Sequence, residues 1–227
     1  MLFRSIASLL AEPKRTAMLW ALMDGSAKSS HELATLVGLS PASANAHLAR
    51  LTGGGLLRVE ARRGKRLFRV AAADVSTAID ALASTTMASA ARSTPQASPM
   101  TLAAPALLRH ARLCHGHLGG ELAAQLYQRM IAAGWIERCE HRTQVTVKGA
   151  QHLAGLGIFT QALALPLVCD CFDWSQQQPH LGGALGAGLL QLFLQSNWIS
   201  AINESRALLV SDTGLAEITR LAGPDAL

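Results

Sequence analysis

Apolar residues recur at helical spacing through the first half of the chain, in short runs separated by turn residues. Such spacing predicts amphipathic helices, and two later runs that alternate predict strands. Ser29 followed by Glu32 is a capping-box pattern, and Ser40-Pro41 joins a hydroxyl cap to a proline at the first helical position. The expected helices cover residues 6–10, 13–23, 30–37, 41–52 and 74–87, and the expected strands cover 56–61 and 67–71.

The order helix, short turn, helix and hairpin is that of a winged helix-turn-helix domain. The second helix of such a turn fits the major groove of DNA, while the tip of the hairpin reaches the neighbouring phosphates. We therefore predict contacts with double-stranded DNA from one helix and one wing. The helix would contribute Ser40, Ala42, Ser43, Asn45, Ala46 and Arg50, and the wing would contribute Arg62, Arg63, Lys65 and Arg66.

The distribution of charge supports a polyanionic partner. Residues 1–90 hold eleven of the 20 lysines and arginines but only six of the 15 aspartates and glutamates, so they carry the whole formal net charge of +5. Within residues 41–70, seven basic residues face only Glu60. A basic stretch of this kind is typical of nucleic-acid binding, and a solvated charged hairpin is the alternative.

The second half of the chain contains an internal repeat. Residues 117–136 (HLGGELAAQLYQRMIAAGWI) recur without a gap as residues 180–199 (HLGGALGAGLLQLFLQSNWI), and ten positions are identical. In each copy the pattern predicts a helix that starts from the HLGG motif, then a strand pair, then a helix that begins at a glycine. Self-similarity of this kind predicts a duplicated unit, here a helix–hairpin–helix.

These features predict a mainly α fold with small β wings. We expect a winged helix-turn-helix domain for DNA binding and dimerisation over residues 1–90 and a linker over 91–106, which is rich in Ser, Thr, Ala and Pro. A tandem-repeat module would follow over 107–227, with repeat units at about 112–160 and about 175–224. The module would serve as a sensor or stabilise a dimer.

Cysteine and histidine residues open each copy of the repeat. Buried structural roles are the reading that the residue types favour, because Cys is among the most often buried residues. The alternatives are a site for zinc or another thiophilic metal, a haem, and a thiol that responds to an oxidant or an organic effector. The candidate residues are Cys114, His115 and His117 in the first copy and Cys169, Cys171 and His180 in the second.

Several classes of protein are disfavoured. The sequence has no phosphate-binding glycine loop, nucleophile elbow or HExxH motif, so we expect no enzyme. The uncharged stretches 149–169 and 174–203 are interrupted by polar residues, so neither is expected to span a membrane. Four cysteines make no disulfide framework, and the N-terminus lacks a cleavage pattern for secretion, which together predict a cytoplasmic protein.

The front half resembles the DNA-binding domain of ArsR-type repressors. The likeness covers residues 1–84 and rests on AEPKRTAMLWALMDG and SSHELATLVGLSPASANAHLARLTGGGLL. It implies a homodimer, paired through the first and last helices of the domain, that reads a roughly palindromic operator. Members of the family often have Arg where this chain has Ala46, and their metal-sensing patterns in the helices at 30–37 and 74–87 are missing here.

A second stretch is similar to the long ArsR-type regulators, which carry an additional C-terminal domain. It comprises CFDWS at residues 171–175 and HLGGALG at residues 180–186. In the family the first copy opens with a Cys-Tyr-Asp-His-Leu-like motif, whereas this chain has Cys114-His115-Gly116-His117-Leu118. The likeness implies an appended sensory or dimer-stabilising module and names no particular signal.

Together these observations predict a homodimeric repressor whose operator binding is modulated by a small molecule, a metal or an oxidant at the C-terminal module. One alternative is a constitutive DNA-binding protein in which this module serves only dimerisation or protein contacts. Another is a MarR-like regulator with a different dimer.

Overall fold

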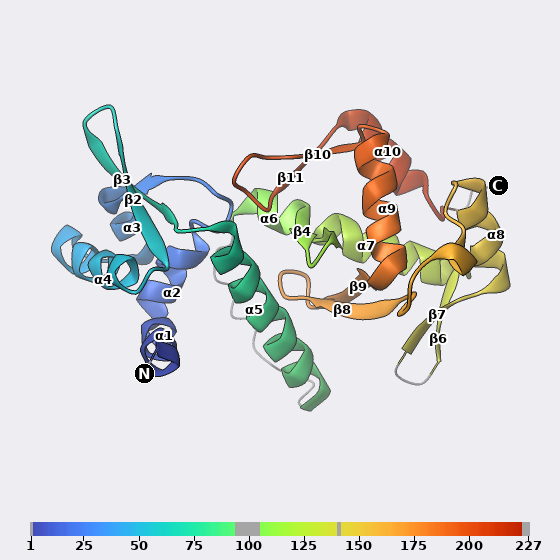
Figure 1. Ribbon diagram of the computed structural model, residues 1–227, viewed down its shortest axis with the longest axis horizontal. Coiled ribbons are helices and arrows are strands. Elements are labelled where there is room, and N and C mark those ends of the chain that lie inside the picture. Colours follow the sequence, from blue (N-terminus) through green and yellow to red (C-terminus); the bar gives the residue numbers. More distant parts are fainter. Residues whose placement is uncertain (1, 94–104, 140–141, 224–227) are drawn as a thin grey trace.

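The computed structural model describes residues 2–93, 105–139 and 142–223 (Figure 1). The front part contains five helices and a three-stranded sheet among these residues. The helices are α1 (Leu2–Leu10), α2 (Pro13–Trp20), α3 (Ser30–Val37), α4 (Pro41–Gly53) and α5 (Ala73–Ser93). The strands are β1 (Lys28–Ser29), β2 (Leu57–Arg62) and β3 (Lys65–Val70), and they pair in the order β1-β3-β2.

Local signals in the sequence set the ends of α3 and α4. The Ser29 hydroxyl accepts a hydrogen bond from the Glu32 N–H at 3.2 Å, and the Glu32 carboxylate accepts one from the Ser29 N–H at 2.7 Å, which completes a capping box. Gly38 ends α3 with φ of 64°, a left-handed conformation that glycine adopts readily. Ser40 caps α4 by accepting from the Ser43 N–H at 3.2 Å.

The front core forms where α2, α3 and α4 pack against the sheet. Its buried side chains include Met18, Leu33, Leu48, Leu51 and Phe68. Strands β2 and β3 form the wing, and a two-residue turn joins them between Arg62 and Lys65. Strand β1 has no counterpart among the predicted elements, because two residues are too few to show a period.

The remaining elements form the C-terminal module, which we define as residues 105–223. Its helices are α6 (Ala106–His110), α7 (Glu121–Ala132), α8 (Val147–Gly155), α9 (Gly183–Gln195) and α10 (Asp212–Arg220), with a short 3-10 turn η1 (Thr160–Ala162). Its hairpins are β4 (Arg112–Cys114) with β5 (His117–Gly119), β6 (Ile136–Cys139) with β7 (Arg142–Val145), β8 (Cys169–Asp173) with β9 (Gln178–Gly182), and β10 (Ile199–Ala201) with β11 (Leu208–Val210).

The HLGG motif differs from its predicted role. Most of the motif is strand: His117 lies in β5 and His180 in β9, and the helices begin directly after the first copy, at Glu121, and at the last residue of the second copy, Gly183. Sequence patterns predict neither hairpin β4–β5 nor hairpin β8–β9, because β4 and β5 have only three residues each and β9 contains Pro179, a residue that argues against a strand. The strand content is therefore larger than small wings alone would provide.

The predicted boundaries also differ from the observed elements in two places. Helix α5 continues to Ser93 and so includes the first residues of the expected linker, most of which lies outside the described residues. Strand β8 begins at Cys169, before the expected start of the second repeat unit near residue 175.

Helices and hairpins of the C-terminal module pack reciprocally. Helix α7 lies against β9, and α9 lies against β5, so each long helix contacts the hairpin that leads into the other one. A shared apolar core lies between them and includes Leu122, Leu126, Leu185, Leu189 and Phe193. Because these leucines occupy corresponding places in the sequence repeat, the two long helices contribute equivalent faces to one core.

Helix α5 lies between the front domain and the C-terminal module (Figure 1). Ser76, Asp80 and Ser84 are buried along one face of α5, at helical spacing. Trp20 of the front domain packs against Trp174 of the β8–β9 turn, with ring centroids 4.5 Å apart. The described helices contain no segment long and apolar enough to cross a bilayer.

Candidate functional site

The ten residues predicted to contact DNA lie on the surface. All of them are exposed, although they come from two separate elements, α4 and the wing. Asn45 of α4 and Arg66 of β3 line the same surface hollow, which also includes Ala49, Thr52 and Val59. Helix and wing therefore share one accessible surface.

The turn of the wing presents its cationic residues to solvent. Arg63 and Gly64 both have positive φ, 50° and 74°, as a tight two-residue hairpin requires. Arg62 and Lys65 pair across the turn and are exposed together with Arg63. The geometry leaves these positive charges available to an anionic partner.

Two other arginines of the basic stretch form ion pairs within the protein. Arg58 of β2 and Arg69 of β3 both form ion pairs with Glu204, which lies in the loop between β10 and β11; the distance from Arg58 Nη2 to Glu204 Oε1 is 3.2 Å. Arg58 also pairs with Glu60, at 3.0 Å. The stretch therefore faces a second carboxylate, from the far half of the chain, which local charge counting could not reveal.

His47 faces the body of the front domain. Its Nδ1 lies 3.5 Å from an oxygen of Glu12, the residue that caps α2. Its side chain is only partly exposed, unlike its neighbour Ala46. This orientation agrees with a structural role for His47.

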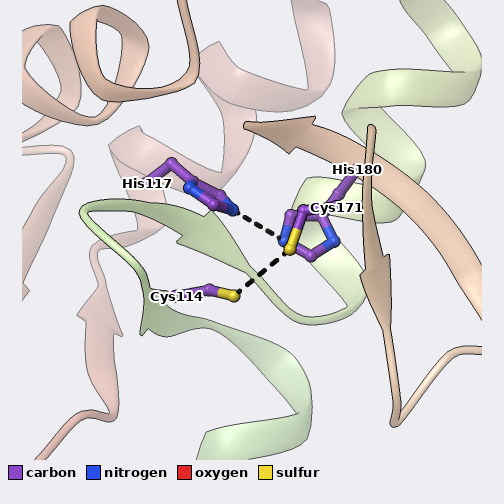
Figure 2. Close-up of side chains that lie close together, drawn as sticks. All are labelled: Cys114, His117, Cys171 and His180. Atoms are coloured by element: carbon purple, nitrogen blue, oxygen red, sulfur yellow. Dashed lines mark hydrogen bonds between the residues drawn. The ribbon is translucent and has the colours of Figure 1, made fainter. Parts of the chain in front are cut away.

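Four of the six candidate cysteines and histidines come together in the C-terminal module, and we call them the Cys2His2 cluster: Cys114, His117, Cys171 and His180 (Figure 2). The two sulfur atoms are 3.8 Å apart, and the Nε2 atoms of the two imidazoles are 3.1 Å apart. All four candidate ligand atoms lie within 4.8 Å of one another. His117 and His180 therefore direct their imidazoles at one another across the two hairpins.

The other two candidates lie beside the cluster. The Nδ1 atom of His115 is 3.4 Å from the Cys114 sulfur, and His115 is exposed in the turn between β4 and β5. Cys169 is exposed at the start of β8. Burial raises the pKa of the Cys169 thiol, so this residue has little thiolate character.

The thiols of the cluster differ in acidity. A hydrogen bond with Cys171, together with burial, raises the pKa of Cys114 to about 12. The same hydrogen bond lowers the pKa of Cys171. Of the two thiols, Cys171 is therefore the more acidic.

A buried ionic network joins the cluster to α5, and it was not predicted. Arg112 Nη2 lies 3.0 Å from Asp173 Oδ2, and Arg112 Nε lies 3.2 Å from Asp80 Oδ1. Arg206 Nη2 reaches the other oxygen of Asp80 at 2.9 Å, and Trp174 donates to Asp80 at 2.5 Å. These residues are far apart in the sequence and belong to no repeated pattern, so nothing in the chain alone indicated their pairing.

The acidic members of this network are held ionised. Burial alone would raise the pKa of Asp80, but the charges of Arg112 and Arg206 outweigh it, and the pKa lies below its ordinary value. The pKa of Asp173 is also lowered, because Arg112 and the Ser175 hydroxyl together outweigh its burial. The network therefore consists of paired charges with few water contacts.

Comparison with known proteins identifies the family of this chain. No family model matches it. The HTH-type transcriptional regulator YdfF of Bacillus subtilis (strain 168) is 30% identical over 212 residues, which cover 92% of this chain and 92% of that protein. The chain belongs to the HTH-type transcriptional regulators. The prediction of a helix-turn-helix regulator is thereby confirmed.

Two solved structures are also similar to parts of this regulator. HlyU from Vibrio cholerae N16961 is 23% identical, with a TM-score of 0.33, and the match covers 36% of this chain and 87% of that one. The homodimeric winged helix-turn-helix DNA-binding domain (fragment 1–100) of Mb0332 from Mycobacterium bovis, a possible ArsR-family regulator, is 22% identical. Its TM-score is 0.36, and the match covers 43% of this chain and 88% of that one.

Proposed function

We propose that this regulator is a homodimeric repressor whose hold on operator DNA is set by its C-terminal module. Helix α4 would enter the major groove, where Ser43 and Asn45 can meet base edges. The exposed Arg62, Arg63 and Lys65 of the wing would bind phosphates and supply affinity that depends on salt. The resemblance to ArsR-type repressors supports repression and a dimer formed through α1 and α5.

One observation supports control by the C-terminal module. The loop between β10 and β11 contacts two parts of the front domain: Glu204 pairs with the wing strands, and Arg206 pairs with Asp80 of α5. A change in the module would therefore reach the wing and the expected dimer helix together. This contact favours a regulatory module over one that serves dimerisation alone.

The duplicated architecture of the module belongs to the same proposal. In the first unit Thr146 caps α8, and its N–H donates to the Trp135 carbonyl at 3.0 Å. In the second unit Ser211 caps α10, and its N–H donates to the Trp198 carbonyl, also at 3.0 Å. These matching contacts support two copies of one unit, each ending in the same helix-to-helix junction.

DNA binding is tested by fluorescence anisotropy with full-length protein and a labelled fragment that carries the promoter of its own gene. We expect affinity to fall steeply as salt rises, and the Arg62→Ala/Arg63→Ala/Lys65→Ala variant to lower the salt slope by about one for each phosphate that is no longer neutralised. Light scattering should give a dimer, and transcription in vitro from that promoter should fall as protein is added. An unchanged slope in the triple variant contradicts the role of the wing.

Control by the module is tested with Glu204→Ala. Removing this carboxylate leaves Arg58 and Arg69 to share the single carboxylate of Glu60, so the wing gains net positive charge and we expect tighter DNA binding and a steeper salt slope. Glu137→Ala is the matched control, because it also removes an exposed negative charge, but from β6 in the C-terminal module instead of the loop that pairs with the wing. Equal behaviour of the two variants contradicts a coupling through Glu204 and favours the constitutive alternative.

A further inference from the structure

The Cys2His2 cluster brings two thiols and two imidazoles from separate hairpins to one point inside the C-terminal module (Figure 2). We propose that Cys114, His117, Cys171 and His180 form a tetrahedral site for a borderline-soft divalent cation, with zinc as the natural occupant. The ion would join β4–β5 to β8–β9.

The distances between the ligand atoms fit such an ion. Zinc bonds of about 2.3 Å to sulfur and about 2.05 Å to nitrogen, in tetrahedral geometry, separate two sulfurs by roughly 3.8 Å and two nitrogens by roughly 3.4 Å. The sulfurs of Cys114 and Cys171 are 3.8 Å apart, and the Nε2 atoms of His117 and His180 are 3.1 Å apart. A disulfide would need the two sulfurs to be about 2.05 Å apart.

The backbone presents the four groups in pairs. In the first hairpin Cys114 stands directly opposite His117, and in the second Cys171 stands directly opposite His180. Residues paired in this way point to the same face of a hairpin. Each hairpin therefore supplies one sulfur and one nitrogen, a donor set that selects zinc over magnesium or calcium.

Two glycines of the repeated motif make room for the cluster. A Cβ placed on Gly119 would lie 2.9 Å from the Cβ of Cys114 and 3.5 Å from the Nε2 of His180. A Cβ placed on Gly182 would lie 3.2 Å from the Cε1 of His117. The nearest contact of each glycine is with a cysteine of its own hairpin, Cys114 for Gly119 and Cys169, at 2.7 Å, for Gly182, and Gly182 is also close to the imidazole from the other hairpin.

A carboxylate stands behind one of the proposed ligands. His180 is fully buried, and its Nδ1 has no hydrogen-bond partner among the described residues, but it lies 3.8 Å from Asp173 Oδ2. Metal-binding histidines commonly direct their second ring nitrogen at such a group, which fixes the orientation of the ring. Asp173 is in turn held by Arg112, so we assign it as a positioning residue.

The site connects to α5 through a short chain of contacts. Arg112 pairs with Asp173 on one side and with Asp80 of α5 on the other. An ion that fixes the two hairpins would therefore also fix the arginine that holds α5. This regulatory step rests on the proposed function, whereas the metal site itself does not.

Metal binding is tested with reduced, full-length protein after removal of bound metal by a chelator. Binding displaces the thiol protons to solvent, and cobalt serves as a coloured substitute for zinc. We expect about one ion per chain, with the visible absorption of tetrahedral cobalt and a charge-transfer band from two thiolates. The wild-type spectrum decides the question without any substitution.

Variants then assign the ligands. Cys114→Ser and Cys171→Ser should each weaken cobalt and zinc binding by at least about tenfold, whereas Cys139→Ser, at an exposed site in β6, should bind like the wild type. Wild-type protein without tetrahedral cobalt overturns the proposal, and so does undiminished binding by both Cys114→Ser and Cys171→Ser. A Cys114–Cys171 disulfide in freshly purified protein that holds no ion overturns it as well.

The two proposals fail separately. If wild-type protein binds promoter DNA but no ion, the metal site is wrong and the proposed function stands. If it binds one ion, yet zinc changes its DNA affinity less than about twofold, the regulatory step is wrong and the site stands.

Discussion

Arg206 donates to Asp80 at 2.9 Å, although 126 residues separate them in the sequence. Both side chains are almost completely buried, and Asp80 receives a second arginine, Arg112. Buried charges in such a network need every partner, because an uncompensated charge in the interior is costly. The contact between α5 and the C-terminal module therefore depends on this carboxylate.

Asp80→Asn should destabilise the protein by about 3–5 kcal/mol, since it leaves buried arginines short of a negative charge. Chemical denaturation followed by circular dichroism measures the effect. Glu217→Gln is the control, because its ion pair with Arg220 lies at the surface and should contribute less than about 1 kcal/mol. Similar losses in the two variants would contradict the importance of the buried network.

Asp80 should also make the stability of the protein depend on pH. The pKa of Asp80 is lower in the folded protein than in the unfolded chain, so its contribution to stability is complete above about pH 5 and is lost as pH falls through the folded pKa. The difference in unfolding free energy between wild type and Asp80→Asn should therefore shrink between about pH 5 and pH 3. A difference that stays constant over this range would show that Asp80 does not act as a carboxylate.

Substitutions of Ser40, the N-cap of α4, can distinguish an effect on stability from an effect on DNA binding. Ser40→Ala removes the acceptor for the Ser43 N–H and should cost about 1 kcal/mol of stability. Ser40→Asp keeps a good cap, so it should retain stability, but it places a negative charge where phosphates are expected and should weaken DNA binding. Thermal melts and anisotropy titrations measure the two effects, and DNA affinity that follows stability alone would contradict the proposed contact surface.

Glycines at the helix junctions test the duplication. A Cβ on Gly149 would lie 1.9 Å from the Trp135 carbonyl oxygen, and one on Gly214 would lie 2.0 Å from that of Trp198. Gly149→Ala and Gly214→Ala should each destabilise the protein by about 1–3 kcal/mol or more, because the backbone must move. Denaturation curves measure these losses.

Gly188→Ala in α9 is the matched control for these glycines. Its new Cβ would meet only Ile158, at 3.8 Å, so the variant should be stabilised by roughly 0.5–1 kcal/mol. A large loss at one junction and none at the other would contradict equivalent units.

Features set by neighbouring residues in the sequence could be predicted, whereas features set by tertiary packing could not. The capping box at Ser29 and the Ser40-Pro41 start fixed two helices within a residue or so, since capping depends on near neighbours. The repeat allowed the groups around Cys114 and Cys171 to approach one another if the two copies packed about a pseudo-twofold axis, but it did not fix which atoms meet. That meeting depends on the reciprocal packing of α7 and α9, which is a tertiary property.

Other features gave no signal in the sequence. Strands β4 and β5 have three residues each, too few for an alternation to appear. Asp80 lies in an ordinary helical pattern, and Arg112 closely follows another arginine, Arg109, so neither stands out from a surface charge. Their partners are fixed only when the front domain and the C-terminal module dock.

Because α7 packs against β9 and α9 packs against β5, the C-terminal module cannot be cut into two fragments without exposing apolar surface. A fragment that ended after α8 would present α7 without the hairpin that covers it. The exposed face of α7 could be covered by the corresponding hairpin of an identical fragment. The first unit produced alone should therefore self-associate. If the proposed duplication holds, the module corresponds to a dimer whose two subunits have been fused into a single polypeptide.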